Sequence, residues 1–299
     1  MFDLRYHVAS LAAVFLALVI GILVGVGISS GGFVRGTERK FLNDKIAKLE
    51  SQLDAAQVRT GDLTRLQRAA DTFVEESYPL LMADLLKGKR IAVVYGGPVD
   101  AATRDLVQRT LSDTGAGGPV RMRAIRVPID LPAVGRSLAG RPGLVRYAKQ
   151  EAARDLGRRL AQELVVGGKT PVWRALSAQL LEERSGSDKG RADAIVVVRS
   201  VPPQKSPTAR LLAGFYAGLA GAEVPAVGVE TTHSSASAID AFERAGLSSV
   251  DYVDTRVGRL ALALLLAGAP GGNYGLKPSA RDGILPPVTP LAETLATEA

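Results

Sequence analysis

The chain has 299 residues, 46% of them hydrophobic, and a formal net charge of +7, so it is long enough to bury a sizeable core in one or two domains. Its basic residues are scattered and do not cluster with aromatic residues, which make up 5% of the chain; this argues against nucleic-acid binding. No cysteine is present, which excludes disulfides, zinc fingers, iron–sulfur ligation and thiol catalysis.

Residues 8–28 are predicted to form a transmembrane helix, because this apolar run contains no charged residue and a helix of its length rises about 30 Å. A cleaved signal peptide is the alternative, but the n-region carries an acid and only one arginine, and the apolar run is longer than usual, so a retained anchor is favoured. Small residues recur every four positions. Gly21 and Gly25 belong to this stripe and form a small-xxx-small pair at which two helices can approach closely.

The charges that flank this helix predict its orientation. Only Arg5 precedes it, whereas basic residues recur between positions 35 and 48. By the positive-inside rule, this asymmetry favours a body in the cytoplasm.

Residues 37–78 are predicted to form a coiled-coil stalk of about five heptads, because apolar residues recur at two interleaved heptad positions between charged ones. The simplest assembly is a parallel homodimer whose seam contains Leu42, Ile46, Leu49, Leu53 and Leu63. The alternative is a single amphipathic helix packed on its own domain.

Residues 88–269 are predicted to form an α/β domain with a small doubly wound, Rossmann-like or flavodoxin-like parallel sheet. We expect strands at 90–96, 120–129, 194–198, 224–229 and 250–253. Helices are expected at 99–113, 144–166, 171–184, 208–219, 237–245 and 256–266.

The rest of the chain, residues 270–299, reads as a loop-like tail. Its aromatic and apolar content would also allow it to dock on a partner protein, and the candidate docking residues are Tyr274, Gly275, Lys277 and Leu285.

A ligand crevice, if used, would lie at the carboxyl ends of the strands. Gly96 and Gly97 follow one strand, and Thr231, Thr232 and His233 follow another. The glycine pair lacks the GxGxxG spacing and the Lys-Ser/Thr pair of phosphate loops, and hydroxyl residues at this place are common helix caps. We therefore predict no catalytic residue and no cofactor, although His233 could act as a base.

Copper(I) prefers thiolate, thioether and imidazole ligands. The chain has two histidines and three methionines, which are far apart in the sequence: His7, His233, Met1, Met82 and Met122. We therefore predict no metal site within one protomer, and a single membrane helix cannot enclose a pore.

The opening MFDLRYHVASLAAVFLALVIGILVGVGI, the stalk and the late NYGLKPSARDGILPP resemble an actinobacterial family named for the mycobacterial copper-transport protein MctB. The same family includes SteB, a corynebacterial cell-separation protein. The resemblance extends over nearly the whole chain. It implies a body outside the cytoplasmic membrane, opposite to the flanking charges, and a role either in copper efflux or tolerance or in regulating wall hydrolysis through protein contacts.

Taken together, these patterns favour a membrane-anchored, dimeric, non-enzymatic envelope protein that binds other envelope or cell-division proteins. One alternative is a copper transporter component whose oligomers build the ion path. The other is an enzyme with a nucleotide- or sugar-binding crevice at the sheet edge.

Overall fold

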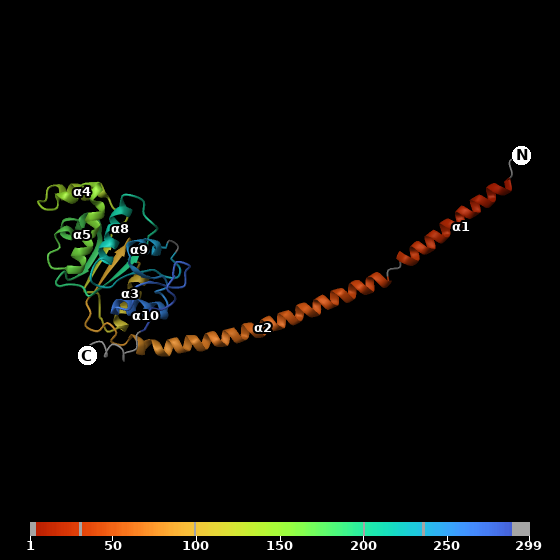
Figure 1. Cartoon of the computed structure of the whole chain (residues 1–299), viewed down its shortest axis with the longest axis horizontal. Helices are drawn as coiled ribbons and strands as arrows, with labels where there is room; N and C mark the ends of the chain where they lie inside the picture. The colour runs from red at the N-terminus through yellow and green to blue at the C-terminus, as the bar shows by residue number, and fades with distance from the viewer. Residues whose placement is uncertain (1–3, 30–31, 99, 200, 235–236, 289–299) are drawn as a thin grey trace. The chain divides into compact units, whose positions relative to one another are not determined.

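The computed structural model describes residues 4–29, 32–98, 100–199, 201–234 and 237–288 (Figure 1). It has two compact units, residues 1–70 and 71–299. The last eleven residues of the predicted tail, 289–299, lie outside the described residues.

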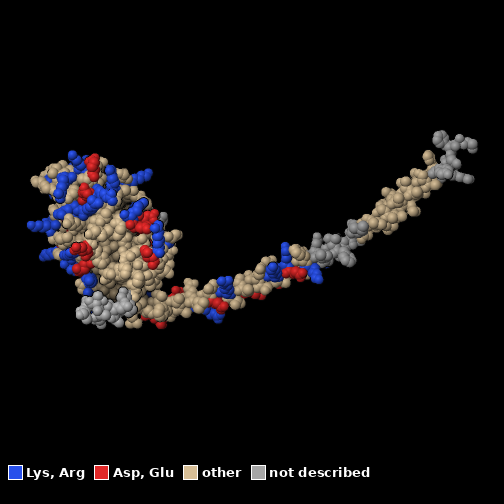
Figure 2. Space-filling view, in the orientation of Figure 1, with Lys and Arg blue, Asp and Glu red and all other residues tan. Residues whose placement is uncertain are grey.

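The first unit is helical. Helix α1 spans Leu4–Ser29, and its segment His7–Gly27 is long and apolar enough to cross a membrane. Helix α2 spans Gly32–Met82, so it begins five residues before the predicted stalk, and charged residues of both signs follow one another along it (Figure 2). The helical stalk is therefore present, while its pairing with a second copy stays a prediction.

The second unit is built on a seven-stranded sheet with the order β3-β2-β1-β4-β5-β6-β7. All neighbouring strands are parallel except β2 and β3. The first six positions reproduce the strand order of doubly wound dinucleotide-binding folds, and the predicted α/β class with a largely parallel sheet is confirmed. The strands are β1 Ile91–Gly96, β2 Arg121–Ile125, β3 Leu181–Gly186, β4 Ala194–Arg199, β5 Ala226–Val229, β6 Ser248–Val250 and β7 Asn273–Tyr274.

Both faces of the sheet are apolar and covered, because successive side chains of a strand point to opposite faces. In β4, Ile195 and Val197 join one core cluster and Val196 joins the other. The first cluster is covered by α4 Leu131–Ala139, α5 Ala153–Val166, α8 Thr208–Ala220 and α9 Ile239–Ala245, and the second by α3 Ala101–Asp113 and α10 Arg256–Ala267 (Figure 1).

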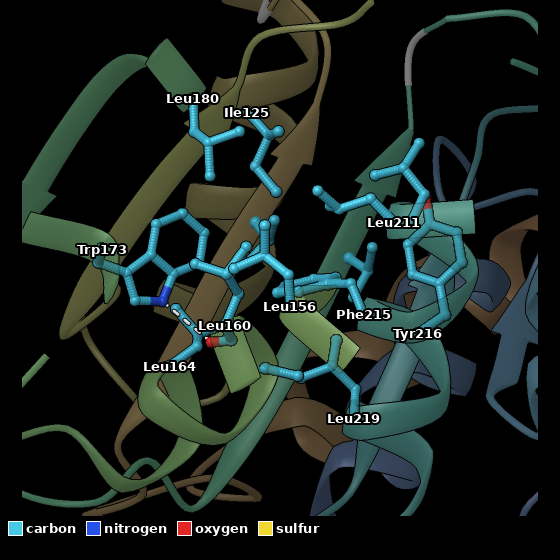
Figure 3. Packing of buried hydrophobic residues seen from close by; sticks show 14 of the residues in the cluster. Ile125, Leu156, Leu160, Leu164, Trp173, Leu180, Leu211, Phe215, Tyr216 and Leu219 are labelled. Atoms are coloured by element: carbon cyan, nitrogen blue, oxygen red, sulfur yellow. Dashed lines mark hydrogen bonds between the residues drawn. The ribbon is translucent and has the colours of Figure 1, made fainter. Parts of the chain in front are cut away.

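Trp173 lies within the first cluster (Figure 3). Its indole Nε1 donates a hydrogen bond to the carbonyl oxygen of Leu160 at 2.9 Å, and its ring meets Phe215 edge-on with 6.3 Å between centroids. These contacts satisfy the polar atom of the indole and confirm that Trp173 is a core residue.

The last turns of α2 belong to the second unit and pack on α10. Tyr78 and Met82 form a small buried cluster with Leu260 and Ala263. The Tyr78 hydroxyl also donates a hydrogen bond to Asp113 Oδ2 at 2.8 Å. The C-terminal end of α2 therefore packs on the chain's own domain, which was the alternative to pairing with a second copy.

Several predicted boundaries require correction. The predicted helix 171–184 is two short helices, α6 Pro171–Ala175 and α7 Ser177–Leu180, followed by β3. The strand was missed because its sequence, LEERSG, is polar and lies exposed at the sheet edge, so it lacks the apolar alternation that signals a strand. Helix α4 was not predicted, and residues 145–147 and 150–152 form short 3₁₀ turns, η1 and η2, before α5.

Glycines allow α5 and α8 to make close backbone contact. A Cβ on Gly214 would overlap the carbonyl oxygen of Arg154, and one on Gly157 would overlap the carbonyl oxygen of Leu211. At Gly218, a Cβ would lie 2.8 Å from that of Ala161. The helices can therefore keep this separation only with glycine at these positions.

We expect Gly214→Ala to lower the free energy of unfolding by about 1–3 kcal/mol, because the added methyl group meets backbone that cannot rotate away. The measurement is urea unfolding in an uncharged detergent, followed by the fluorescence of Trp173, the chain's one tryptophan. Gly140→Ala is the control, because an added Cβ there meets nothing within 4 Å; it should change stability by less than about 0.5 kcal/mol. A Gly214→Ala variant as stable as the parent would contradict this account of the packing.

Candidate functional site

The carboxyl ends of β4 and β5 border a cavity of about 210 Å³. This is the edge at which ligands bind in open α/β sheets. The cavity brings together polar side chains from three separate segments: Asp100, Thr103, Arg199, Glu230, Thr231, His233 and Ser234. Two of the predicted crevice residues, Thr231 and His233, therefore line one real cavity.

Gly96 and Gly97 are not among the described residues that line this cavity. The amide of Gly97 donates to the carbonyl oxygen of Ile125 at 2.9 Å, and an added Cβ at this residue would overlap the side chain of Val201. Its φ of +111° is also one that L side chains rarely adopt. The backbone conformation and the close packing of this turn therefore account for Gly97, and a bound phosphate is not needed to explain it.

The N-terminus of α3 supports the same conclusion. Asp100 caps this helix by accepting a hydrogen bond from the amide of Thr103 at 2.8 Å. Hydrogen bonding with the Thr103 side chain, followed by that with the Thr103 amide, holds the pKa of Asp100 below its ordinary value. A carboxylate already occupies the place where the helix would bind an anion.

Thr232 joins His233 to Asp254. Its amide donates to Asp254 Oδ1 at 2.8 Å, its hydroxyl donates to Asp254 Oδ2 at 2.5 Å, and the same hydroxyl lies 2.8 Å from His233 Nδ1. Burial would raise the pKa of Asp254, but the hydrogen bonds from Thr232 outweigh it and hold the pKa below its ordinary value. The His233 side chain is 94% exposed, so the cluster orders a turn and does not enclose a reaction site.

Glu230 is a deeply buried charge of this edge, with a side chain that is 1% exposed. Its carboxylate accepts from the Ser237 hydroxyl and the Ala238 amide, each at 2.8 Å. It also pairs with Lys277 Nζ at 2.6 Å, and the same ammonium donates to the carbonyl oxygen of Thr231 at 3.0 Å. The end of β5, the start of α9 and the C-terminal segment thus meet at one carboxylate.

Asp251 binds the C-terminal segment at a second point. Its buried carboxylate accepts hydrogen bonds from the amides of Leu276 and Lys277 at 2.9 and 3.0 Å. Gly275 lies against this carboxylate so closely that a Cβ would overlap it. The NYGLK segment, residues 273–277, therefore packs around two buried carboxylates, those of Glu230 and Asp251.

Part of the predicted loop-like tail from residue 270 packs on the α/β domain. Tyr274 is buried in β7, and Gly275 and Lys277 are held by the two acids, so these three residues face the protein's own body. Leu285 is 37% exposed, and Leu276 and Ile284 in the same segment are exposed as well. The non-local contacts to residues 230 and 251 could not be read from the sequence of the segment.

The predicted pairing residues lie on the helices as expected. Around Gly21 and Gly25 nothing lies within 4 Å of an added Cβ. The stalk residues Leu42, Ile46, Leu49, Leu53 and Leu63 are each between 51% and 62% exposed. The single chain thus leaves this apolar seam uncovered.

Soft metal ligands do not converge within the described part of the chain, where no three His, Cys, Asp or Glu side chains are grouped to hold a metal ion. Met82 and Met122 are buried in the core. His7 is exposed on α1, and His233 is exposed in the α/β unit. The donors that copper prefers are thus buried or isolated.

Comparison with known proteins identifies the family. The family model described as "Copper transport outer membrane protein, MctB" matches residues 1–285. The chain belongs to the MctB family. Similar curated proteins are the copper transporters MctB of Mycobacterium tuberculosis and Mycobacterium bovis, which are 34% identical over 122 residues. These alignments cover 40% of this chain and 36% of each relative's length.

The MctB match confirms the family resemblance and links the chain to copper transport. Together with α1, whose segment His7–Gly27 can cross a membrane, the family description supports membrane anchoring.

We expect Lys277→Met to lower the free energy of unfolding by about 3 kcal/mol or more, because it leaves the Glu230 carboxylate buried without its counter-charge. Arg281→Met is the matched control in the same segment. It removes an exposed pair with Glu243 and should cost less than about 1 kcal/mol.

Urea unfolding of the three proteins at neutral pH measures both effects. Adding Glu230→Gln to Lys277→Met should recover part of the loss, since no buried charge then remains unpaired. Equal losses for Lys277→Met and Arg281→Met would show that the buried pair does not hold this segment.

Proposed function

We propose that this MctB-family chain is a membrane-anchored, dimeric envelope protein that supports copper homeostasis by binding partner proteins and does not itself carry the ion. The observation that supports this most is the placement of the copper-preferring donors. Met82 and Met122 are buried in the core, and His7 and His233 belong to different units.

The arrangement of residues also argues against the two other roles considered for the chain, a copper transporter component and an enzyme. A transport path would need several copies, since one membrane helix encloses no pore. An enzyme would need a sheltered site, whereas His233 is almost fully exposed. A scaffold that regulates wall hydrolysis requires the same anchor, stalk and binding surfaces, and we keep it as the second version of the partner-binding role.

We propose that the α/β unit lies outside the cytoplasmic membrane, as the family description favours. The basic residues that follow α1 favour the opposite side. The membrane helix could anchor the chain, and the stalk could pair, on either side of the membrane.

We further propose that a second copy of this chain covers the stalk seam in parallel. The seam leucines are more than half exposed in one chain, and burying each contributes about 1.5–3 kcal/mol. Anchoring both copies by the same end enforces the parallel direction, and Gly21 and Gly25 would allow the membrane helices to continue the contact.

The chain's lack of cysteine allows a direct test of pairing. We expect a Leu53→Cys variant, in membranes under mild oxidation, to form a disulfide-linked dimer on a non-reducing gel, because seam positions of parallel helices face each other. Val58→Cys, which is equally exposed but lies off the seam, should remain monomeric. Cross-linking of both variants alike would indicate random collision, and cross-linking of neither would contradict the dimer.

For copper, we expect the purified full-length protein to bind no stoichiometric Cu(I) at nanomolar strength in competition with a Cu(I) chelator. In a deletion strain, a His7→Ala/His233→Ala variant should restore growth in copper as well as the parent does. A Leu49→Lys/Leu53→Lys variant should fail, because charges in the seam separate the helices.

Tight stoichiometric Cu(I) binding, or loss of tolerance in the histidine variant, would instead favour a transporter component. A septation defect without copper sensitivity in the deletion strain would favour the wall-remodelling version.

A further inference from the structure

A second cavity of the α/β unit, about 480 Å³, lies between α8 and α9 and adjoins the Glu230 cavity, since Arg199 lines both. Arg154, Arg199 and Arg244 line it together with apolar side chains such as those of Leu212 and Ala241. Its volume is within the range of small-molecule sites, about 300–1,000 Å³, and its mixture of apolar wall and a few polar groups is typical of them.

The three arginines come from different elements that the fold holds in place. Arg199 ends β4 at the sheet's carboxyl edge and is 5% exposed. Its guanidinium donates to the carbonyl oxygens of Val201 at 3.1 Å and Pro202 at 2.8 Å, which fixes its direction. Arg154 lies on α5 at the glycine contact with α8, and Arg244 lies in the last turn of α9.

Nothing in the described lining neutralises these charges. The lining contains no carboxylate, and none of the three arginines has an ion pair in the part of the chain that the structure describes. Nearby acids are paired elsewhere: Asp155 with Arg158 at 3.3 Å, and Glu243 with Arg281 at 3.2 Å. Three unpaired guanidinium groups around one concavity create a strongly positive local potential.

Tyr216 adds a polar atom to the cavity wall. The residue is 3% exposed, and its hydroxyl has no hydrogen-bond partner among the described residues. Burial raises the pKa of this hydroxyl to about 12, so it stays protonated at neutral pH and can donate a hydrogen bond. Its ring packs against Phe242 with 5.1 Å between centroids, which holds the hydroxyl in place.

The charge of the surrounding surface has the same sign. Lys and Arg side chains gather over the part of the unit formed by α4, α5 and α8 (Figure 2). Exposed members of this surface include Arg136, Arg141, Arg146 and Arg158. Such a field raises the local concentration of anions before they reach the cavity.

We propose that this arginine-lined cavity binds an organic phosphate or pyrophosphate. The arginines would hold the anion through bidentate, charge-assisted hydrogen bonds, and the apolar wall would hold the attached organic group. The volume exceeds what an inorganic phosphate fills, so the organic part contributes to binding. A nucleotide and a phosphorylated lipid share this chemistry. The site is independent of copper and of stalk pairing.

The test is calorimetric titration of the full-length protein, in an uncharged detergent, with inorganic pyrophosphate, ADP and geranyl pyrophosphate. We expect at least one organic pyrophosphate to bind at least tenfold more tightly than inorganic pyrophosphate. Arg154→Gln/Arg244→Gln should weaken that binding at least tenfold, since two anion contacts are lost from exposed residues whose replacement leaves the core intact.

Arg174→Gln/Arg210→Gln is the control, because it removes the same net charge from exposed residues of α6 and α8 that do not line the cavity. Its affinity should match that of the parent. Preference for ADP would indicate a soluble ligand and preference for geranyl pyrophosphate a lipid, and either supports the site.

Failure of all three probes to bind the parent protein would overturn the proposal. Equal weakening in the control variant would overturn it too, because binding would then follow net charge. Circular dichroism of each variant establishes that it is folded.

Discussion

The α/β unit is organised by the need to cover a sheet that is apolar on both faces. Parallel strands leave no face for water, and each connection that leads from one strand to its parallel neighbour supplies a helix to one side or the other. Helix α10 also needs to be covered on more than one side, because its sequence is apolar nearly all round. Its inner side packs on the sheet, and Leu260 and Ala263 on another side are covered by Tyr78 and Met82 from the end of α2. The stalk helix therefore completes the core of the unit that it joins.

The family name and the local chemistry give different kinds of information. The MctB match extends over residues 1–285 and links the chain to copper transport, yet the soft donors in the described residues are buried or isolated. The NYGLK segment, which carried part of the resemblance, packs around the buried acids Glu230 and Asp251. Part of what identifies this chain by sequence thus maintains the fold, and the proposed partner-binding role would rely on the exposed seam and surface.

The sequence predicted those strands and helices whose formation depends on a local pattern of apolar residues. The apolar run of β4 and the amphipathic helices around it were readable because burial on both faces requires such residues. The polar edge strand β3 and the two-residue strand β7 were not, since each is defined by its neighbour in the sheet. The same limit applies to the sites. Thr231 and His233 were found from their position after β5, whereas the cavity of Arg154, Arg199 and Arg244 joins residues far apart in the sequence. The partner of Lys277, 47 positions away, was equally hidden.

The absence of cysteine has a consequence for durability. Copper cycling between its two oxidation states consumes thiols first and thioethers next, and oxidised methionine disrupts packed cores. This chain offers no thiol, and Met82 and Met122 lie inside the fold at 0% and 5% exposure. Folded, it therefore exposes little sulfur to copper-driven oxidation in the residues that the structure describes.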